Sequence, residues 1–130
     1  MKILFVCRSN ILRSKIAEAY FKKINKNQKI RVSSAGFRTD GDPLYDTEKE
    51  VAKEFNLKLS PKIRKINKKI IEDSDIVILV ADNVDPKEIS AKKLIVWKIE
   101  DPKENFDKER VKKVFLSVMR EVENLVKELN

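Results

Sequence analysis

The chain has 130 residues, which is enough for one compact domain with a hydrophobic core and too few for two. Its single cysteine excludes an internal disulfide, and it has neither an apolar run long enough to cross a bilayer nor a leader-type N-terminus, so we expect a cytoplasmic protein that does not bind membranes. The formal net charge is +8, but the lysines are interleaved with glutamates and lack the interleaved aromatic residues of nucleic-acid binders, so we expect no nucleic-acid partner. Only the basic stretch over residues 62–69 could attract an acidic partner.

Four short apolar runs predict β-strands, and helical patterns separate them. The runs cover residues 2–6, 29–34, 75–81 and 94–97. Strands that are joined by helices pair in parallel, with right-handed crossovers and with helices on both faces of the sheet. The sequence therefore predicts a three-layer α/β fold with a four-stranded parallel sheet, formed by residues 1–130 as a single domain.

Helical patterns fill the segments between the predicted strands. A first helix follows the first strand and ends near Ile24, and a long amphipathic helix closes the chain. Residues 47–50 have the form of a capping box, which predicts another helix start. Ser60 followed by Pro61 predicts a further start, because isoleucines recur after it at helical spacing, and residues 86–90 predict a short helical piece.

The segment from Cys7 to Arg13 joins the first strand directly to the first helix. A nucleophile in this position lies over the unpaired N–H groups of a helix N-terminus, where anions bind. The helix dipole and Arg13 both favour the thiolate form of Cys7. Loop amides around a thiolate, together with a bidentate guanidinium, form a site for a tetrahedral oxyanion.

Asp101 lies just after the fourth predicted strand, as Cys7 lies at the end of the first. In folds with an open parallel sheet, ligands bind beyond the carboxyl ends of the strands. The pattern therefore predicts that Cys7 and Asp101 share one cleft, although they are far apart in the sequence.

Several features of the chain occur together in one known family. Arg13-Ser14 follows Cys7 after five residues, Asn10 lies inside the loop, and the first helix opens with Ala-Glu-Ala. The runs at residues 32–36 and 74–79 and the pair Asp101-Pro102 follow in a consistent order. In these features the chain resembles the low-molecular-weight protein tyrosine phosphatases over most of its length.

The resemblance implies a phosphatase without metal or other cofactor, acting as a monomer on phosphotyrosine-containing proteins or small aryl phosphates. Cys7 would be the nucleophile that forms a cysteinyl-phosphate, Arg13 would clamp the phosphate oxygens, and Asp101 would be the general acid and then the general base. Ser14 would donate its hydroxyl hydrogen to the thiolate, and Asn10 would brace the loop. The resemblance gives phosphate binding to the other residues of the loop, namely Arg8, Ser9, Asn10, Ile11, Leu12 and Ser14.

Asp-Pro pairs also occur at Asp42 and Asp85. The choice of Asp101 as general acid therefore depends on its place after the fourth strand. Pro102 favours extended backbone at Asp101, which can direct the carboxylate into the cleft.

The chain departs from the family pattern at several positions. Ser9 replaces a usual glycine, so either Ser9 takes the glycine's backbone shape or the loop shifts. Leu12 replaces a frequent second cysteine. The chain has no histidine, and Lys62 falls near the place of the family histidine that supports the loop asparagine. Phe37 and Phe106 are candidates for contact with a substrate ring, and an ordinary core role is equally open to each.

Other functions remain as alternatives. Arsenate reduction on the same fold uses a relay of cysteines, so one cysteine leaves only a version with external thiols. Phosphoarginine phosphatases typically have a small hydroxyl residue after the loop asparagine, whereas Ile11 at this position favours an aryl phosphate. A phosphocarrier would have to keep its phosphoryl group from water, which Arg13 and Asp101 argue against. A phosphotyrosine-binding module without turnover would follow if Ser9 distorted the loop.

Overall fold

The computed structural model describes residues 1–102 and 107–130. Strands and helices alternate along the chain, as the sequence predicts. In chain order they are β1 (Lys2–Cys7), α1 (Arg13–Ile24), β2 (Arg31–Gly36), α2 (Asp46–Glu54), α3 (Lys68–Glu72), β3 (Ile76–Val80), the 3-10 helix η1 (Pro86–Glu88), β4 (Leu94–Trp97) and α4 (Lys108–Leu129).

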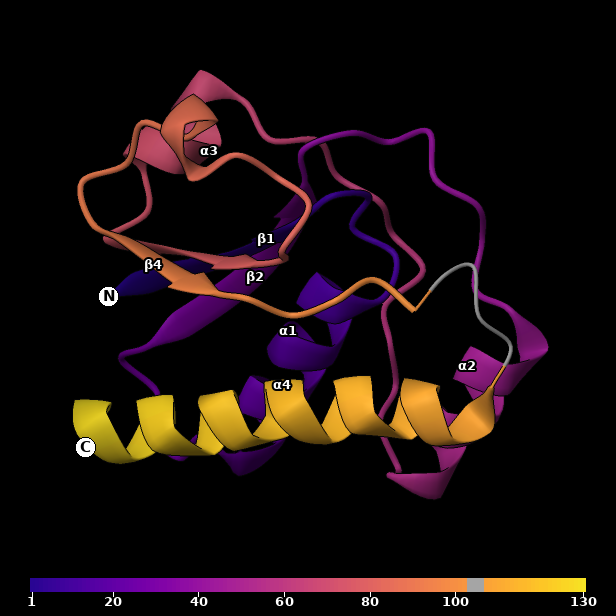
Figure 1. Cartoon of the computed structure of the whole chain (residues 1–130). Helices are drawn as coiled ribbons and strands as arrows, with labels where there is room; N and C mark the ends of the chain where they lie inside the picture. The colour runs from indigo at the N-terminus through magenta and orange to yellow at the C-terminus, as the bar shows by residue number, and fades with distance from the viewer. Residues whose placement is uncertain (103–106) are drawn as a thin grey trace.

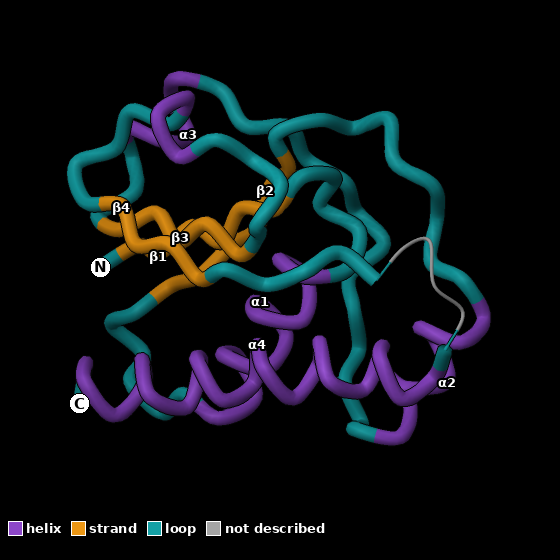
Figure 2. Tube along the Cα trace, viewed as in Figure 1, coloured by secondary structure: helices purple, strands orange, loops and turns teal. Residues whose placement is uncertain are grey.

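The four strands form one parallel sheet in the order β2-β1-β3-β4 (Figure 2). Leu4 of β1 pairs with Ser33 of β2 on one side and with Val77 of β3 on the other. All residues of β3 are buried, as its continuous run of β-branched and aliphatic residues predicts. Because every strand runs in the same direction, all four carboxyl ends lie at one edge of the sheet, and the predicted parallel sheet is confirmed.

Helices cover both faces of the sheet, so the predicted three-layer fold is confirmed (Figure 1). Successive residues of a strand point to opposite faces. Phe5 and Ile78 belong to the core that α1, α2 and α4 cover, which also contains Phe21 and Phe115. The other face is closed largely by residues from 66 to 91, and its buried residues are Leu4, Val6, Cys7, Ala35, Val77, Leu79, Ala81 and Ile89.

The segment after Ser60 differs from the sequence prediction. It does not begin a helix at Pro61, and α3 starts only at Lys68, where the side chain of Asn67 accepts a hydrogen bond from the backbone N–H of Ile70. Residues 62–66 instead run beside the end of β2. Two backbone hydrogen bonds tie them to Gly36, which donates to the carbonyl of Arg64 (2.7 Å) and accepts from the N–H of Ile66 (2.9 Å). This pairing outweighs the local helix signal, because tertiary contacts override propensity.

Gly36 is needed where this segment, β2 and the loop after β1 meet. A Cβ atom at Gly36 would lie 2.7 Å from the backbone nitrogen of Asn10 and 2.7 Å from the carbonyl oxygen of Arg38. Any larger residue would therefore push the loop after β1 away from its place.

Two element starts also differ from the sequence prediction. β2 spans Arg31–Gly36 and not residues 29–34, so it reaches further toward the edge at which β1 ends. α2 begins at Asp46, and the backbone N–H of Tyr45 donates to Oε1 of Glu48 at 2.8 Å. The predicted start at residues 47–50 was wrong because the buried Glu48 turns back to the residue before the helix.

Among the described residues, no helix is long and apolar enough to cross a membrane.

Candidate active site

The chain forms a narrow pocket where β1 passes into α1. β1 ends at Cys7 and α1 begins at Arg13, so the loop of residues 8–12 surrounds the sulfur at the N-terminus of a helix. The lining residues are Cys7, Ser9, Ile11, Leu12, Arg13 and Asp101. The free space is about 20 Å³, enough for about one water molecule. The structure thus brings the predicted nucleophile, clamp and general acid to one pocket.

Arg13 is buried and is held by residues that follow the two neighbouring strands. Its Nη1 donates to the carbonyl oxygen of Ile99 (2.8 Å), and its Nη2 donates to Oδ1 of Asn83 (2.9 Å). Carboxylate oxygens of Asp82 and Asp101 lie 3.8 and 3.5 Å from the same two nitrogens. Burial of an arginine demands such partners. These contacts fix the guanidinium beside the pocket and connect it to the candidate general acid.

Asp82 and Asn83 are site residues that the sequence analysis did not name. They directly follow the predicted strand at 75–81, at the same sheet edge as Cys7 and Asp101. The rule that ligands bind beyond the carboxyl ends of parallel strands could have found them.

A wider cleft lies next to the pocket and shares Ser9 and Asp101 with it. It has a volume of about 780 Å³, enough for a substrate part as large as an aromatic side chain and its neighbours. The cleft is strongly polar. Its lining residues are Arg8, Ser9, Asp40, Gly41, Asp42, Tyr45, Asp82, Asn83, Glu100, Asp101 and Arg110.

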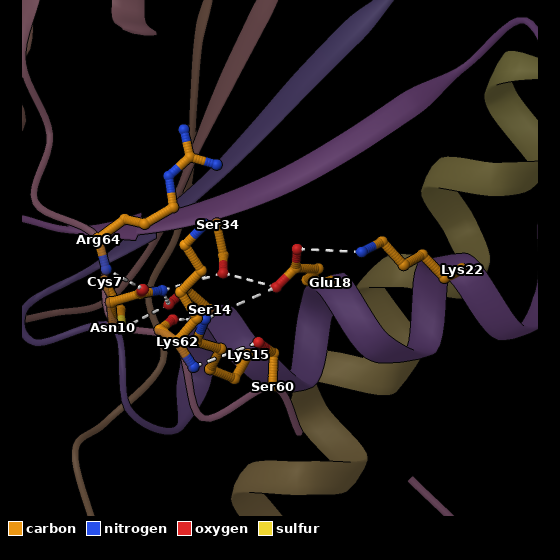
Figure 3. A network of polar contacts seen from close by, with 10 residues as sticks. All are labelled: Cys7, Asn10, Ser14, Lys15, Glu18, Lys22, Ser34, Ser60, Lys62 and Arg64. Carbon is orange, nitrogen blue, oxygen red and sulfur yellow. Dashed lines mark hydrogen bonds and ion pairs between the residues drawn. The ribbon is translucent and has the colours of Figure 1, made fainter. Parts of the chain in front are cut away.

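Asn10 organises the buried side of the loop (Figure 3). Its Nδ2 donates to Oγ of Ser14 (2.9 Å) and to Oγ of Ser34 (3.0 Å), and its Oδ1 accepts from the backbone N–H of Arg64 (2.9 Å). Its φ of 56° lies in the left-handed region, which asparagine tolerates better than most residues. The amide therefore braces the loop, as predicted for Asn10, and points away from the pocket.

The Asn10 amide contacts two serine hydroxyls and leaves their hydrogens available for other acceptors. Each serine oxygen accepts a hydrogen from the Asn10 amide, so each hydroxyl hydrogen is free for another acceptor. Ser34 donates to Oε1 of Glu18 at 2.7 Å, and Oγ of Ser14 lies 3.0 Å from the Cys7 sulfur. Because a thiolate can only accept, Ser14 is the donor of this hydrogen bond whenever Cys7 is ionised.

Ser9 does not take the backbone shape that only glycine takes easily. Among the described non-glycine residues, Asn10 and Asn56 alone have a positive φ. The loop therefore closes around Cys7 without strain at Ser9, and Asn10 supplies the left-handed residue.

The remaining sequence candidates have other places. Arg8 is exposed and lines the wider cleft. Phe37 lines neither the pocket nor the cleft, and Phe106 lies outside the described residues. The Lys62 side chain does not hold Asn10, because the backbone N–H of Arg64 does so. Asp85 caps η1 by accepting from the N–H of Lys87 (3.0 Å).

The described residues offer no ready metal centre. Residues 1–102 and 107–130 contain no group of three or more histidine, cysteine, aspartate or glutamate side chains placed to hold a metal ion together. Arg13 lines the pocket, Arg8 lines the adjoining cleft, and the N-terminus of α1 adds a partial positive charge beside the sulfur.

Comparison with known proteins gives a family and a set of similar structures. The family model described as "Low molecular weight phosphotyrosine protein phosphatase" matches residues 2–130. None of the curated protein sequences matches the chain significantly.

Three solved structures illustrate the range of similar proteins. An arsenate reductase from Archaeoglobus fulgidus is 28% identical with a TM-score of 0.75, over 96% of this chain and 98% of that one. An arginine phosphatase from Drosophila is 24% identical with a TM-score of 0.86, over 100% of this chain and 98% of that one. A tyrosine phosphatase from Erwinia amylovora is 23% identical with a TM-score of 0.78, over 98% of this chain and 91% of that one.

Proposed function

Because the chain belongs to the low molecular weight phosphotyrosine protein phosphatase family, we propose that it hydrolyses phosphotyrosine and other aryl phosphates, without a metal, through a cysteinyl-phosphate intermediate. One observation carries the proposal: Cys7, Arg13 and Asp101 line a single pocket at the end of β1. They supply the nucleophile, the phosphate clamp and the proton donor that this reaction needs.

In the first step, the Cys7 thiolate attacks the phosphorus atom in line with the leaving oxygen. The S–P bond forms while the bond from phosphorus to the aryl oxygen breaks, and Asp101 gives its proton to that oxygen. Ser14 donates its hydroxyl hydrogen to the thiolate before attack, since its oxygen lies 3.0 Å from the sulfur and a thiolate can only accept. Arg13 and the loop N–H groups bind the non-bridging phosphate oxygens.

In the second step, the Asp101 carboxylate takes a proton from a water molecule that attacks phosphorus. The P–S bond breaks, inorganic phosphate is released, and Cys7 leaves as a thiolate. The Ser14 hydroxyl makes the sulfur a better leaving group through the same hydrogen bond.

Arg13 must exchange contacts when phosphate binds, because the free space over Cys7 is only about 20 Å³. Its bonds to Ile99 and Asn83 both use terminal nitrogens, which are the donors that grip a phosphate bidentately. We expect substrate binding to replace at least one of them with a phosphate oxygen.

Two residues support an aryl phosphate as substrate. Ile11 is an apolar residue of the pocket wall, and Tyr45 is the one aromatic residue among the described residues that line the cleft. The pKa of Tyr45 is raised, first by desolvation and then by Asp42, which accepts a hydrogen bond from the phenol (3.3 Å). The phenol therefore stays neutral, and the ring lines the cleft, where an aromatic leaving group can pack against it.

We expect Tyr45→Ala to raise the KM for phosphotyrosine about 3- to 10-fold, since an aromatic pair contributes about 0.5–1.5 kcal/mol. Tyr45→Phe keeps the ring and serves as the matched control, with an unchanged KM. Steady-state kinetics with phosphotyrosine and with an alkyl phosphate give the measurement. An equal rise for both substrates would contradict ring packing.

Arsenate reduction is the second candidate, because a similar structure 28% identical to this chain is an arsenate reductase. Cys7 is the only cysteine, so an internal cysteine relay cannot operate. Reduction would require an external thiol to attack a Cys7–arsenate adduct.

The test is hydrolysis of p-nitrophenyl phosphate by the purified protein in EDTA. We expect full turnover, because arginine and backbone N–H groups supply the positive field. Activity that disappears in EDTA and returns with a divalent ion would contradict the proposal. Arsenate-dependent oxidation of glutathione without phosphate release would favour the second candidate, and phosphate binding without release would indicate a carrier or binding module.

A further inference from the structure

Lys15 is a buried lysine that the proposed mechanism does not use. Its side chain is 3% exposed, although lysine is almost never buried so fully without partners. Its Nζ donates a hydrogen bond to the carbonyl oxygen of Lys62 and lies 3.9 Å from Oε1 of Glu18 (Figure 3). The ammonium thus joins α1 to the segment over residues 62–66.

Through these two contacts, Lys15 supports the groups that form hydrogen bonds with the two ends of the Asn10 side-chain amide. Glu18 accepts the Ser34 hydroxyl, which makes Ser34 an acceptor for the Asn10 amide N–H. On the other side, the segment that Lys15 holds at Lys62 presents the N–H of Arg64 to Oδ1 of Asn10. The buried Lys15 ammonium therefore supports both ends of the Asn10 amide, the Nδ2 donor and the Oδ1 acceptor. Asn10 in turn holds Ser14 next to Cys7.

The charges around Lys15 also connect it to the sulfur. Burial lowers the pKa of Lys15, whereas Glu18 and then the Cys7 thiolate raise it, and Arg64 and Lys22 lower it. The Lys15 ammonium and an ionised Cys7 sulfur therefore attract each other. The charge lies behind the loop and leaves the phosphate side of the pocket to Arg13.

We propose that Lys15 is a positioning residue for Cys7: the buried Lys15 ammonium holds Asn10, and through it Ser14, in place from both sides. The proposal rests on the proposed function, in which Cys7 is the nucleophile, and it adds a residue to that site. It assigns no contact between Lys15 and the substrate.

The test follows the rate at which iodoacetamide alkylates Cys7 as the pH is raised. Cys7 is the only cysteine, so the modified fraction reports this sulfur alone. In Lys15→Met, which keeps the length and removes the charge, we expect the midpoint of the profile to move to higher pH. Alkylation below the midpoint should slow about 3- to 10-fold, as loss of a nearby opposite charge requires.

Lys22→Met is the matched control. Lys22 pairs with the same carboxylate, its Nζ lying 3.2 Å from Oε2 of Glu18, but it is 59% exposed, and among the described contacts it has none with Lys62, Asn10 or Ser34. Its loss should leave the alkylation profile unchanged, because exposed ion pairs contribute little.

Lys15→Gln is the second variant, since its side-chain amide can still donate to the Lys62 carbonyl without a charge. We expect the midpoint of the alkylation profile to move to higher pH in both Lys15 variants and to stay unchanged in Lys22→Met. A wild-type profile in either Lys15 variant would overturn the proposal, and so would an equal shift in Lys22→Met. If Lys15→Met does not fold, Lys15→Gln decides, and failure of both to fold would assign Lys15 a purely structural role and overturn the proposal.

The alkylation profile separates this proposal from the proposed function. It needs no turnover, so a wild-type protein that fails to release phosphate would contradict the function alone. Protection of Cys7 by inorganic phosphate, measured in each variant, shows that the loop is still formed around the sulfur.

Discussion

Cys7→Ser is expected to lower the turnover of p-nitrophenyl phosphate by at least about 10⁴-fold, because loss of a covalent nucleophile removes the reaction path and not one contact among several. The serine oxygen lies in the same pocket but is a far weaker nucleophile at neutral pH than a thiolate. Rates are measured with excess variant protein over long incubations, so that wild-type contamination is kept below the expected residual activity.

Binding of phosphate should survive this substitution. Before phosphate binds, Ile99 and Asn83 still hold Arg13 beside the pocket and the N-terminus of α1 still has its N–H groups, since none of these contacts involves the sulfur. We therefore expect calorimetry with phosphate or vanadate to give an affinity near that of the wild type. Turnover within about tenfold of wild type would remove Cys7 as the nucleophile, and a loss of binding together with activity would indicate a collapsed loop.

The sequence predicts the fold well wherever local patterns and the sheet agree. β4 was predicted at its observed bounds, and β3 within one residue at each end, because their apolar runs are bounded by polar residues. Residues 61–67 could not be predicted in the same way. Their extended course depends on backbone hydrogen bonds to Gly36, which lies in a distant part of the sequence, and only the assembled sheet brings the two together.

The residues of the candidate site likewise differ in how far the sequence could predict them. The loop from Cys7 to Ser14 is contiguous, so its sequence predicts that a thiol, loop amides and a guanidinium come together, but it left open the backbone at Ser9 and did not predict that Asn10 takes the left-handed conformation. Asp101 was predicted from its place at the sheet edge, and Asp82 could have been found by the same rule. Lys15 could not, because a lysine in the first turn of a helix is ordinarily exposed, and this one is buried by contact with the segment that the sequence assigned to a helix.

Asp101→Asn is expected to slow the release of a poor leaving group much more than that of a good one. Phosphotyrosine leaves as a basic phenolate unless it receives a proton, whereas p-nitrophenolate leaves readily without one. Loss of a general acid costs about 10²–10⁴ in rate when protonation is needed, so we expect a loss of this size in kcat for phosphotyrosine and a much smaller one for p-nitrophenyl phosphate.

The Michaelis constant of Asp101→Asn for phosphotyrosine should not rise. Asp101 Oδ2 lies 3.5 Å from Nη2 of Arg13, and the neutral amide of asparagine fills the same place without repelling a phosphate dianion. We therefore expect KM to stay level or fall while kcat falls, which separates a lost proton donor from a damaged binding site.

Two other aspartates serve as controls that test whether the general acid is Asp101. Asp85 caps η1 and lines neither the pocket nor the cleft, and asparagine caps equally well, so Asp85→Asn should retain wild-type kinetics with both substrates. Asp42 lines the cleft, and Asp42→Asn should lack the dependence on leaving group because Asp42 does not line the pocket that holds Cys7. Asp101→Asn could instead slow both substrates equally and slightly, while Asp42→Asn slows phosphotyrosine far more than p-nitrophenyl phosphate. In that case the proton comes from Asp42, and the pocket supplies only the nucleophile and the clamp.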